Sequence, residues 1–513
     1  MELSSATPAW FVLISKLVYL TLLLEHVKEL LARLPGFDEQ SFEVDLGIPA
    51  SEAAAGRRTP LSVRGVARAL PVLLRLRRAY RRQLAADRRY VRRFSERKAA
   101  YDREPEELER LELPAFRDRY RELIADFYFE TETSYFYTIY NASNAKLDFK
   151  APFEAANRAS GGSLDYLKLV GGLLDLSHLR PAQDLHARLA RLRAEASDPD
   201  EATVRDFARR WKHQGRKVLD IRTPRWSEDL DLVREMIARA HAGWREESEP
   251  ERRAREQHAS YRAERARALH ALRWRPLLRA RFAAGLARLR AYAWWREEMR
   301  DHSTYAYYLV RLWTLEAARR LVAAGSIESA DDVWCLTHQD VLAALEARLA
   351  AHSARERVRA ARELLDSFRS FANPGEIGER HRDAARAALP DSAAVLRGRA
   401  CSPGCGEGPA RVARNLEEAR GIQPGEVLVA IYTDPGWTPY FGSLAAVVTE
   451  TGGLLSHAAV IAREYGLPAV LNVLDATCLV TSGDHLVVDG NQGTVAIVRR
   501  ASPCRESEPV ADE

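Results

Sequence analysis

The stretch Thr449–Val470, with the sequence TETGGLLSHAAVIAREYGLPAV, carries the most information about the fold of this chain. A glycine pair at 452–453 comes shortly before His457, and the residues after His457 predict a short helix that ends near Gly466. The small alanines of that helix would let it lie close against a sheet, and the apolar residues 469–471 follow a turn. We therefore expect His457 in the first turn of a helix within a small α/β domain.

The position of His457 suits an anion. The first N–H groups of a helix have no partner inside the helix, and the helix dipole is positive at that end. The same field disfavours an imidazolium and would keep His457 neutral and nucleophilic near pH 7. Gly452 and Gly453 let the backbone take positive φ angles and approach a ligand closely, and Thr451 or Ser456 could cap the helix. We predict a phosphoryl group on His457, with these four residues as its phosphate loop. The alternative is a capped surface helix that happens to carry a histidine.

From about residue 402 to 498, the sequence resembles the phosphohistidine swivelling (mobile) domain of PEP-utilising enzymes. The matching segments are Ser402–Gly404 with Gly408, Pro424–Val429, Thr433–Pro439, the His457 segment, Val488–Gly490 and Gly493–Val495. The segment 433–439 is similar to the rifampin phosphotransferase branch of this family, close to PEP synthase-like proteins. The resemblance implies that His457 carries phosphate between two distant sites.

The rest of the chain predicts a different architecture. Residues 1–395 show helical spacing of apolar residues, with Arg/Glu pairs three or four positions apart. We predict helices over 185–196, 204–219, 229–239, 264–289 and 353–371. Residues 396–408 suggest a linker, 409–500 the swivelling domain and 501–513 a disordered tail. The expected fold is multidomain: a mostly α-helical, substrate-binding-like domain followed by a small α/β phosphohistidine domain.

The helical part also resembles the substrate-binding domain of rifampin phosphotransferase-like proteins. The matching places are Pro35–Asp38, Asp220–Asp229, Arg296 and Glu297 with Arg300, Arg311, Gly325, and Asp331–Trp334 with Leu336. Two places depart from the family pattern. Lys212–Gly215 stands where Gly-His-Arg-Gly is usual, and Val218 falls near a usual glutamate. These departures bear on the identity of the substrate more than on the fold.

Arg296 and Arg300 are four residues apart and so project from one face of a helix. Arginine binds phosphate through paired, charge-assisted hydrogen bonds. The family pattern here is Arg-Glu-x-x-x-Lys, which implies that both positions handle phosphate and that Arg300 replaces a lysine. Arg311 and Asp332 are further candidates. The alternative for the pair is a solvated, charged helix face.

Composition narrows the class of protein. The chain has 77 basic and 72 acidic residues, interspersed along helices, which gives no indication of nucleic-acid binding. The apolar segment 10–24 is short and contains Lys16, so we expect a buried helix and no membrane span. Five scattered cysteines without a signal peptide favour a cytoplasmic protein, and no cluster has the spacing of a metal site.

We find no Gly-x-x-x-x-Gly-Lys-Ser/Thr phosphate loop in the sequence and no ATP-grasp pattern. We therefore expect a phosphotransferase component, dikinase-like, whose histidine is loaded by a separate ATP-grasp protein using ATP and Mg²⁺, with no permanently bound cofactor. The acceptor would be a small molecule bound by the helical domain. The alternative is a catalytically silent binding or regulatory module that retains the swivelling-domain fold.

Overall fold

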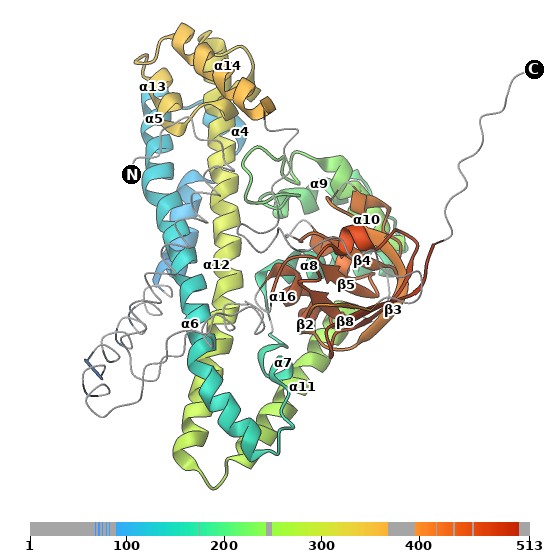
Figure 1. Cartoon of the computed structure of the whole chain (residues 1–513). Coiled ribbons are helices and arrows are strands. Elements are labelled where there is room, and N and C mark those ends of the chain that lie inside the picture. Colours follow the sequence, from blue (N-terminus) through green and yellow to red (C-terminus); the bar gives the residue numbers. More distant parts are fainter. Residues whose placement is uncertain are drawn as a thin grey trace, which may run out of the picture. The chain divides into compact units, whose positions relative to one another are not determined.

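The computed structural model describes residues 89–501 apart from 174, 243–248, 368–394, 417, 434–436 and 454–455, together with six single positions between 67 and 82. The chain divides into two compact units, each described here by itself. Unit 1 comprises Met1–Leu147 and His302–Asn373, and unit 2 comprises Asp148–Asp301 and Pro374–Glu513. Two long helices, α6 (Phe129–Ala159) and α12 (Pro276–Ala323), each contribute residues to both units (Figure 1).

Unit 1 is helical throughout its described part. Besides its shares of α6 and α12 it contains a helix over 89–101, α4 (Pro105–Glu109), α5 (Leu113–Glu122), the π-helix η1 (Leu123–Tyr128), η3 (Ala330–Cys335), α13 (His338–Leu345) and α14 (Ala351–Ser367). Its core is aromatic: Phe116, Tyr120 and Trp313 are fully buried, and the rings of Phe116 and Trp313 stack at 5.3 Å.

The helical part of unit 2 consists of shorter elements. These are α7 (Tyr166–Val170), η2 (Ser177–Leu179), α8 (Arg180–Ala194), α9 (Glu201–Arg210), α10 (Leu230–Ala242) and α11 (Glu249–Ala271), with its shares of α6 and α12. Side-chain caps begin two of them: Asp165 accepts from the first amides of α7, and Asp200 accepts from the amide of Thr203 in α9. Helices α8, α9 and α10 share one apolar cluster.

The prediction of a mostly helical chain with a small mixed sheet near its C-terminal end is confirmed. Two predicted helix ranges were wrong. The helix predicted over 204–219 ends at Arg210, and Gly215 instead forms an isolated bridge with Arg225. The helix predicted over 264–289 is two helices, because the chain turns at 272–275 and Pro276 starts α12, where a proline is tolerated. No helix among the described residues is both long and apolar enough to cross a membrane; the segment 10–24 lies outside them.

The C-terminal part of unit 2 is an eight-stranded sheet in the order β1-β8-β7-β3-β4-β5-β6-β2. The strands are β1 (Val395–Arg397), β2 (Arg399–Ser402), β3 (Cys405–Val412), β4 (Val427–Ala430), β5 (Ala446–Thr449), β6 (Ala469–Leu471), β7 (His485–Asp489) and β8 (Thr494–Arg499). Strands β3, β4, β5 and β6 are parallel, and the flanking pairs are antiparallel. Every residue of β4 and β5 is buried, as expected for parallel strands covered on both faces.

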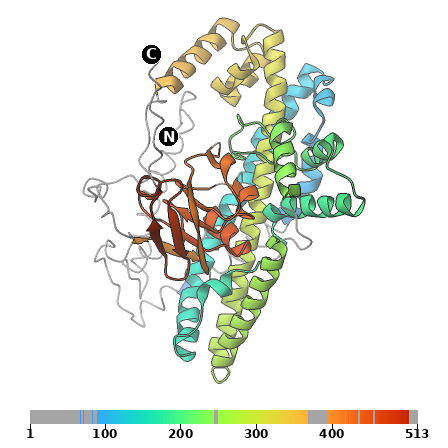
Figure 2. The ribbon, with the colours of Figure 1, turned by 90° about the vertical axis from the view of Figure 1, so that its right-hand side faces the viewer.

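Short helices complete this sheet domain, which Figure 2 shows in orange to red. They are η5 (Glu418–Gly421), α15 (Thr438–Phe441), α16 (His457–Glu464) and α17 (Ala476–Leu479). Helix α16 contacts β2, β5 and β6. Alternate residues of β4 enter two separate cores: Leu428 faces the core shared with α16, whereas Val427 and Val429 face the other.

The segment 396–408, predicted as a linker, is part of the sheet. It supplies most of β1, all of β2 and the start of β3, so the sheet domain begins at Val395 rather than at residue 409. Its small residues misled the prediction because two of them serve close packing: a Cβ at Gly406 would collide with the carbonyl of Ala445, and one at Gly408 with that of Gly425. Of the predicted tail, the amide of Ala501 donates to Asp484, and 502–513 lie outside the described residues.

Candidate functional site

The loop that leads into α16 is fixed to the neighbouring strand end. The amide and the Oγ1 of Thr451 both donate to the carbonyl of Ile431, each at 3.0 Å, and Thr449 Oγ1 donates to the carbonyl of Thr451 at 2.7 Å. Thr451 therefore holds the loop and does not cap the helix. Ser456 is the cap, with its Oγ accepting from the amide of Ala459 at 3.4 Å.

The two glycines of this loop differ. Gly452 has a φ of +133°, and a Cβ there would meet Ser456 Oγ at 3.1 Å and Leu471 at 3.3 Å. Gly453 does not have a positive φ, and a Cβ there would have no atom within 4 Å. Gly452 thus uses the positive φ that a glycine allows, whereas Gly453 does not. The carbonyl of Gly453 accepts from Ser456 N at 2.9 Å, which ties the loop to the cap residue.

His457 is the first residue of α16 and is 7% exposed. The alanines at 458, 459 and 462 are buried in the core that also contains Val447 and Leu471, which confirms that small residues let this helix approach the sheet. The ring of Phe441 stands edge-on to the ring of His457, with centroids 6.5 Å apart. The imidazole therefore lies at the N-terminal, electropositive end of a buried helix.

Helix α12 places Arg300 against this imidazole. Arg300 Nη1 lies 3.4 Å from His457 Nδ1, which accepts the hydrogen bond because a guanidinium only donates. The lone pair of the neutral ring is thus on Nδ1. Arg300 has no carboxylate within ion-pair distance among the residues that the structure describes, so its charge faces a neutral ring.

Arg296, one turn earlier on α12, has a different partner. Its Nε and Nη2 donate to Glu297 Oε1 at 3.1 and 2.8 Å. The structure therefore brings Arg300, but not Arg296, into hydrogen-bond contact with His457. Arg296 acts on the imidazole only through its charge at longer range.

His178, on η2, was not found by sequence reasoning. Its ring stands edge-on to that of His457 with centroids 6.5 Å apart, and its Nδ1 is 3.5 Å from Glu297 Oε2. Ser177 Oγ donates to the backbone carbonyl of Glu297 at 3.0 Å. A lone histidine between a serine and a leucine carries no local signal, and only its place beside Glu297 and His457 makes it notable.

The 169–179 segment that carries His178 is tied to α12. Arg290 donates to the carbonyls of Leu169, Gly171 and Gly172 at 3.0, 2.5 and 2.9 Å. The apolar side chains of this segment enter the same core as the alanines of α16; they are Leu173, Leu176 and Leu179. Apolar packing on one side and hydrogen bonds on the other therefore set where η2 meets α16.

Burial and charge set the protonation states. Burial lowers the pKa of His457 well below its usual 6.5, and the nearby charges of Arg300, His178 and Arg296 lower it further against the opposing effect of Glu297. Burial alone would raise the pKa of Glu297, but Arg296, His178 and Arg300 outweigh it and hold this pKa well below 4.5. At neutral pH the site thus contains a neutral imidazole beside a cation, and an ionised carboxylate.

Arg311 and Asp332 belong to unit 1, whereas the residues above belong to unit 2. The carboxylate of Asp332 accepts from the amides of Glu328 and Ser329 and pairs with Arg362, so it closes a helix start. The guanidinium of Arg311 lies 5.4 Å from the ring centroid of Trp334. These contacts stabilise unit 1, and a role in phosphate handling stays a prediction for both residues.

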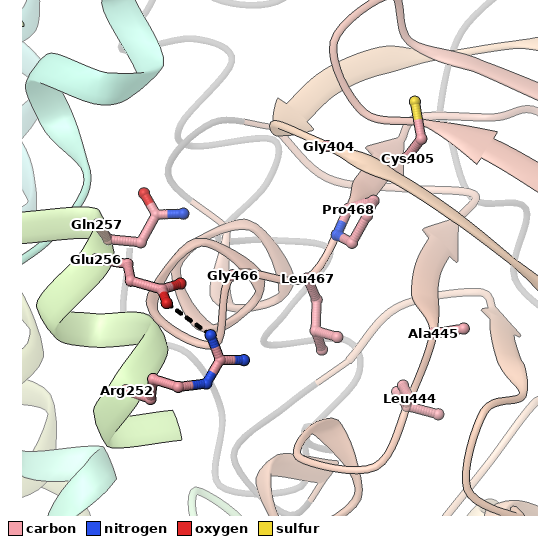
Figure 3. Close-up of a pocket in the computed structure, with 10 residues that line it drawn as sticks. All are labelled: Arg252, Glu256, Gln257, Gly404, Cys405, Leu444, Ala445, Gly466, Leu467 and Pro468. Atoms are coloured by element: carbon pink, nitrogen blue, oxygen red, sulfur yellow. Dashed lines mark hydrogen bonds and ion pairs between the residues drawn. The ribbon is translucent and has the colours of Figure 1, made fainter. Parts of the chain in front are cut away.

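A polar pocket of about 300 Å³ lies elsewhere in unit 2, between α11 and the sheet domain (Figure 3). Its lining includes Arg252, Glu256 and Gly466–Pro468. Arg252 and Glu256 pair at 2.6 Å, so their charges largely cancel. His457 does not line this pocket, which is therefore separate from the site.

Residues 422–493, which include His457, match the family model for the PEP-utilising enzyme, mobile domain. The chain is 34% identical over 218 residues to a rifampicin phosphotransferase of Bacillus cereus, covering 42% of this chain and 24% of that protein. It is 31% identical over 323 residues to a rifampicin phosphotransferase of Streptomyces sviceus, with 59% and 35% covered. A third relative is the prodigiosin synthesizing transferase PigC of Serratia marcescens, at 32% over 301 residues, with 56% and 32% covered.

The sheet domain with its histidine at a helix start thus corresponds to a mobile domain of PEP-utilising enzymes. Between 42% and 59% of the chain is similar to these two rifampicin phosphotransferases, which confirms the resemblance seen in the sequence. It spans about a quarter to a third of the length of the curated relatives described above.

Proposed function

We propose that this chain is a phosphotransferase component in which His457 carries a phosphoryl group to a small-molecule acceptor. The observation that carries the proposal is the pairing of a buried, neutral His457 at a helix N-terminus with Arg300, a cation that has no carboxylate partner among the described residues. A neutral imidazole is a nucleophile, and a guanidinium beside it that makes no ion pair with a described carboxylate is a ready ligand for phosphoryl oxygens.

The electrostatic setting favours the loaded over the empty histidine. Among the described residues, the hydrogen bond that Arg300 donates is to His457 Nδ1 at 3.4 Å, a long contact and a weak partner for a cation. A phosphoryl group brings two negative charges to the start of α16, where the helix amides and Arg300 both favour an anion. Catalysis in such a site is mainly positioning and stabilisation of charge.

The transfer step would proceed as follows. An acceptor hydroxyl or carboxylate oxygen forms a bond to phosphorus while the bond between phosphorus and the His457 nitrogen breaks. The electron pair of that bond returns to the ring, which takes up the proton that a hydroxyl acceptor loses. Arg300 stabilises the equatorial oxygens during the transfer, and Arg296 adds positive charge from one turn away.

A separate ATP-grasp protein is the donor in this proposal, with ATP and Mg²⁺ acting through it and ATP converted to AMP and phosphate. The similarity of the chain to rifampicin phosphotransferases supports a donor of this type. An ATP-using donor also implies a cytoplasmic location. Rifampicin, an acceptor named for two relatives, suggests a small organic molecule with a hydroxyl group as the class of acceptor.

The experiment that tests the proposal is transfer of labelled phosphate to the purified chain. The chain is incubated with γ- or β-labelled ATP and Mg²⁺, with and without a candidate ATP-grasp protein, and the acid-labile, base-stable label is mapped by mass spectrometry. We expect label on His457 only when the donor is present.

The matched control is His457→Ala, which should take no label, with His270→Ala as an exposed histidine variant that should be labelled normally. Equal labelling of the His457→Ala variant would overturn the carrier role. Absence of label with every donor, including small phosphoryl donors, would favour a silent binding or regulatory module instead.

A further inference from the structure

His178 is a largely buried titratable residue that the proposed transfer step leaves unused. Both of its ring nitrogens are buried and have no hydrogen-bond partner among the residues that the structure describes. Its Nδ1 is 3.5 Å from Glu297 Oε2, an ion-pair distance that is longer than a good hydrogen bond. Buried polar atoms are almost always hydrogen-bonded, so a ring with two unsatisfied nitrogens points to a missing partner.

The ring of His178 faces the ring of His457. Their edge-to-face arrangement, with centroids 6.5 Å apart, keeps the two imidazoles out of direct hydrogen-bond contact. A phosphoryl group bonded to a ring nitrogen of His457 would place its oxygen atoms outside that ring. Such an oxygen falls within hydrogen-bond reach of a His178 nitrogen if it occupies the space between the rings.

Glu297 determines which nitrogen of His178 is available. Its carboxylate is ionised, buried and held by Arg296, and it lies on the Nδ1 side of the ring. A carboxylate at this ion-pair distance attracts the Nδ1 side of the ring and so orients it, as second-layer carboxylates orient histidines in other active sites. Nε2 is then left to face the other way.

The backbone around His178 is also fixed in advance. Ser177 donates to the carbonyl of Glu297, and Arg290 holds the 169–172 carbonyls against α12. Leu176 and Leu179, on either side, are buried in the core that contains α16. A ring held this way loses little conformational freedom when it binds a ligand.

We propose that His178 is a second phosphoryl-binding residue: as an imidazolium, in which both ring nitrogens carry a proton, it directs Nδ1–H toward Glu297 and donates Nε2–H to an oxygen of the phosphoryl group on His457. This inference rests on the proposed function. The charged and titratable groups around the bound phosphoryl are then Arg300, Arg296, His178 and Glu297, three potential cations and one anion. His178 shares the phosphoryl charge with Arg300 from a different element.

The test uses phosphoramidate, a small donor that phosphorylates histidine without any partner protein. The bond between phosphorus and nitrogen in phosphoramidate breaks, a His457 ring nitrogen bonds to phosphorus, and the ring proton leaves with the departing ammonia as ammonium. The full chain is incubated with phosphoramidate, the reaction is stopped with alkali, and the rate of His457 phosphorylation is measured by mass spectrometry.

Two variants of similar size separate binding from packing. His178→Leu removes the donor and should slow loading about tenfold, the loss expected for one charge-assisted hydrogen bond. His178→Gln keeps an N–H donor near the position of Nε2 and should stay within about threefold of the unmodified chain. The exposed His270→Ala variant should load at the unmodified rate. Matching thermal unfolding curves establish that the variants are folded.

The outcomes distinguish this inference from the proposed function. Loading of His457 that is equally fast in the His178→Leu variant would overturn the role of His178 and leave the carrier role intact. Equal losses in the Leu and Gln variants would assign His178 to packing and also overturn the inference. If the unmodified chain takes no phosphate on His457, the proposed function itself fails.

Discussion

The site has two halves that form in different ways. The local half is the continuous stretch 449–457, in which Thr451, Gly452 and Ser456 place His457 at the start of α16. The distant half consists of 177–178 and 296–300, which are separated by more than a hundred residues and meet through Ser177 and Glu297. The local half supplies His457, the proposed nucleophile, and the distant half supplies the charges around it.

The two halves differ in what a substitution would disturb. In the local half, each bond satisfies the backbone of a turn or a helix end, so a change there alters the loop first. In the distant half, buried charges compensate one another, so loss of one partner leaves another charge buried without compensation. Substitutions in the two halves should therefore differ in size and in kind.

The largest expected effect is that of Glu297→Gln. This change removes the carboxylate that holds Arg296 and faces His178, and we expect the free energy of unfolding of unit 2 to fall by about 3 kcal/mol. Urea denaturation followed by circular dichroism measures it. Glu256→Gln breaks an exposed pair with Arg252 and should cost less than about 1 kcal/mol. Similar losses for the two variants would contradict the importance of burial.

Arg300→Ala should slow phosphorylation of His457 by phosphoramidate about a hundredfold, because it removes the one cation in hydrogen-bond contact with the imidazole. Arg300→Lys keeps the charge and should lose about tenfold or less. Arg296→Ala should affect unfolding more than loading, since its guanidinium is bound to Glu297. A larger loss of loading for Arg296→Ala than for Arg300→Ala would reverse the division of roles between the two arginines.

The two glycines of the local half give a matched pair. Gly452→Ala forces a side chain into a φ of +133° and against Ser456 Oγ, and we expect it to lower the free energy of unfolding by about 2 kcal/mol. Gly453→Ala meets no atom within 4 Å and should change the free energy of unfolding by less than about 0.5 kcal/mol. Thermal unfolding of both variants checks this, and equal melting temperatures would show that the turn tolerates a side chain.

The pH dependence of the free energy of unfolding tests how the two halves of the site act together on His457. Its pKa is lowered by burial and by the cations around it, so the folded chain resists protonation that the unfolded chain accepts. Stability should therefore be unaffected above about pH 6.5 and fall below it, by up to about 1.4 kcal/mol per pH unit, until the folded pKa is reached. Urea denaturation near neutral and at mildly acidic pH measures this. The His457→Gln variant should show a weaker acid dependence, and an unchanged one would exclude His457 as the cause.

The smallest expected effect is that of Ser456→Ala. The cap hydrogen bond to Ala459 is 3.4 Å long, so its loss should cost about 0.5 kcal/mol, at the low end for helix caps. Hydrogen exchange of the first amides of α16 is the sensitive measurement, and faster exchange confined to that turn is expected. A loss above about 2 kcal/mol would mean that Ser456 supports more than the helix start.

Much of the local half was predictable from sequence. Glycines before a serine, a histidine and a run of small apolar residues predict a turn, a cap and a helix against a sheet, and the structure contains all three. The same reasoning failed for glycine, which can serve either conformational freedom or close packing. Gly453 does not need its conformational freedom, and Gly406 and Gly408 serve close strand packing rather than a linker.

The distant half was predictable only in part. Arg296 and Arg300 share a helix face by their spacing alone, but spacing could not tell that Glu297 would bind the first and leave the second for His457. His178 had no signal, because its neighbours in sequence, Ser177 and Leu179, are ordinary buried residues. Its importance comes from contacts with residues that are 119 and 279 positions away (178 to 297 and 178 to 457).

The sequence by itself thus determined the position of His457, the proposed nucleophile, at a helix start, since turn, cap and helix depend on contacts within a few residues. Only the tertiary structure decided the surroundings of His457. Burial and the positions of Arg300, Glu297 and His178 set the neutral state of His457, and these depend on packing between segments that are far apart in the chain.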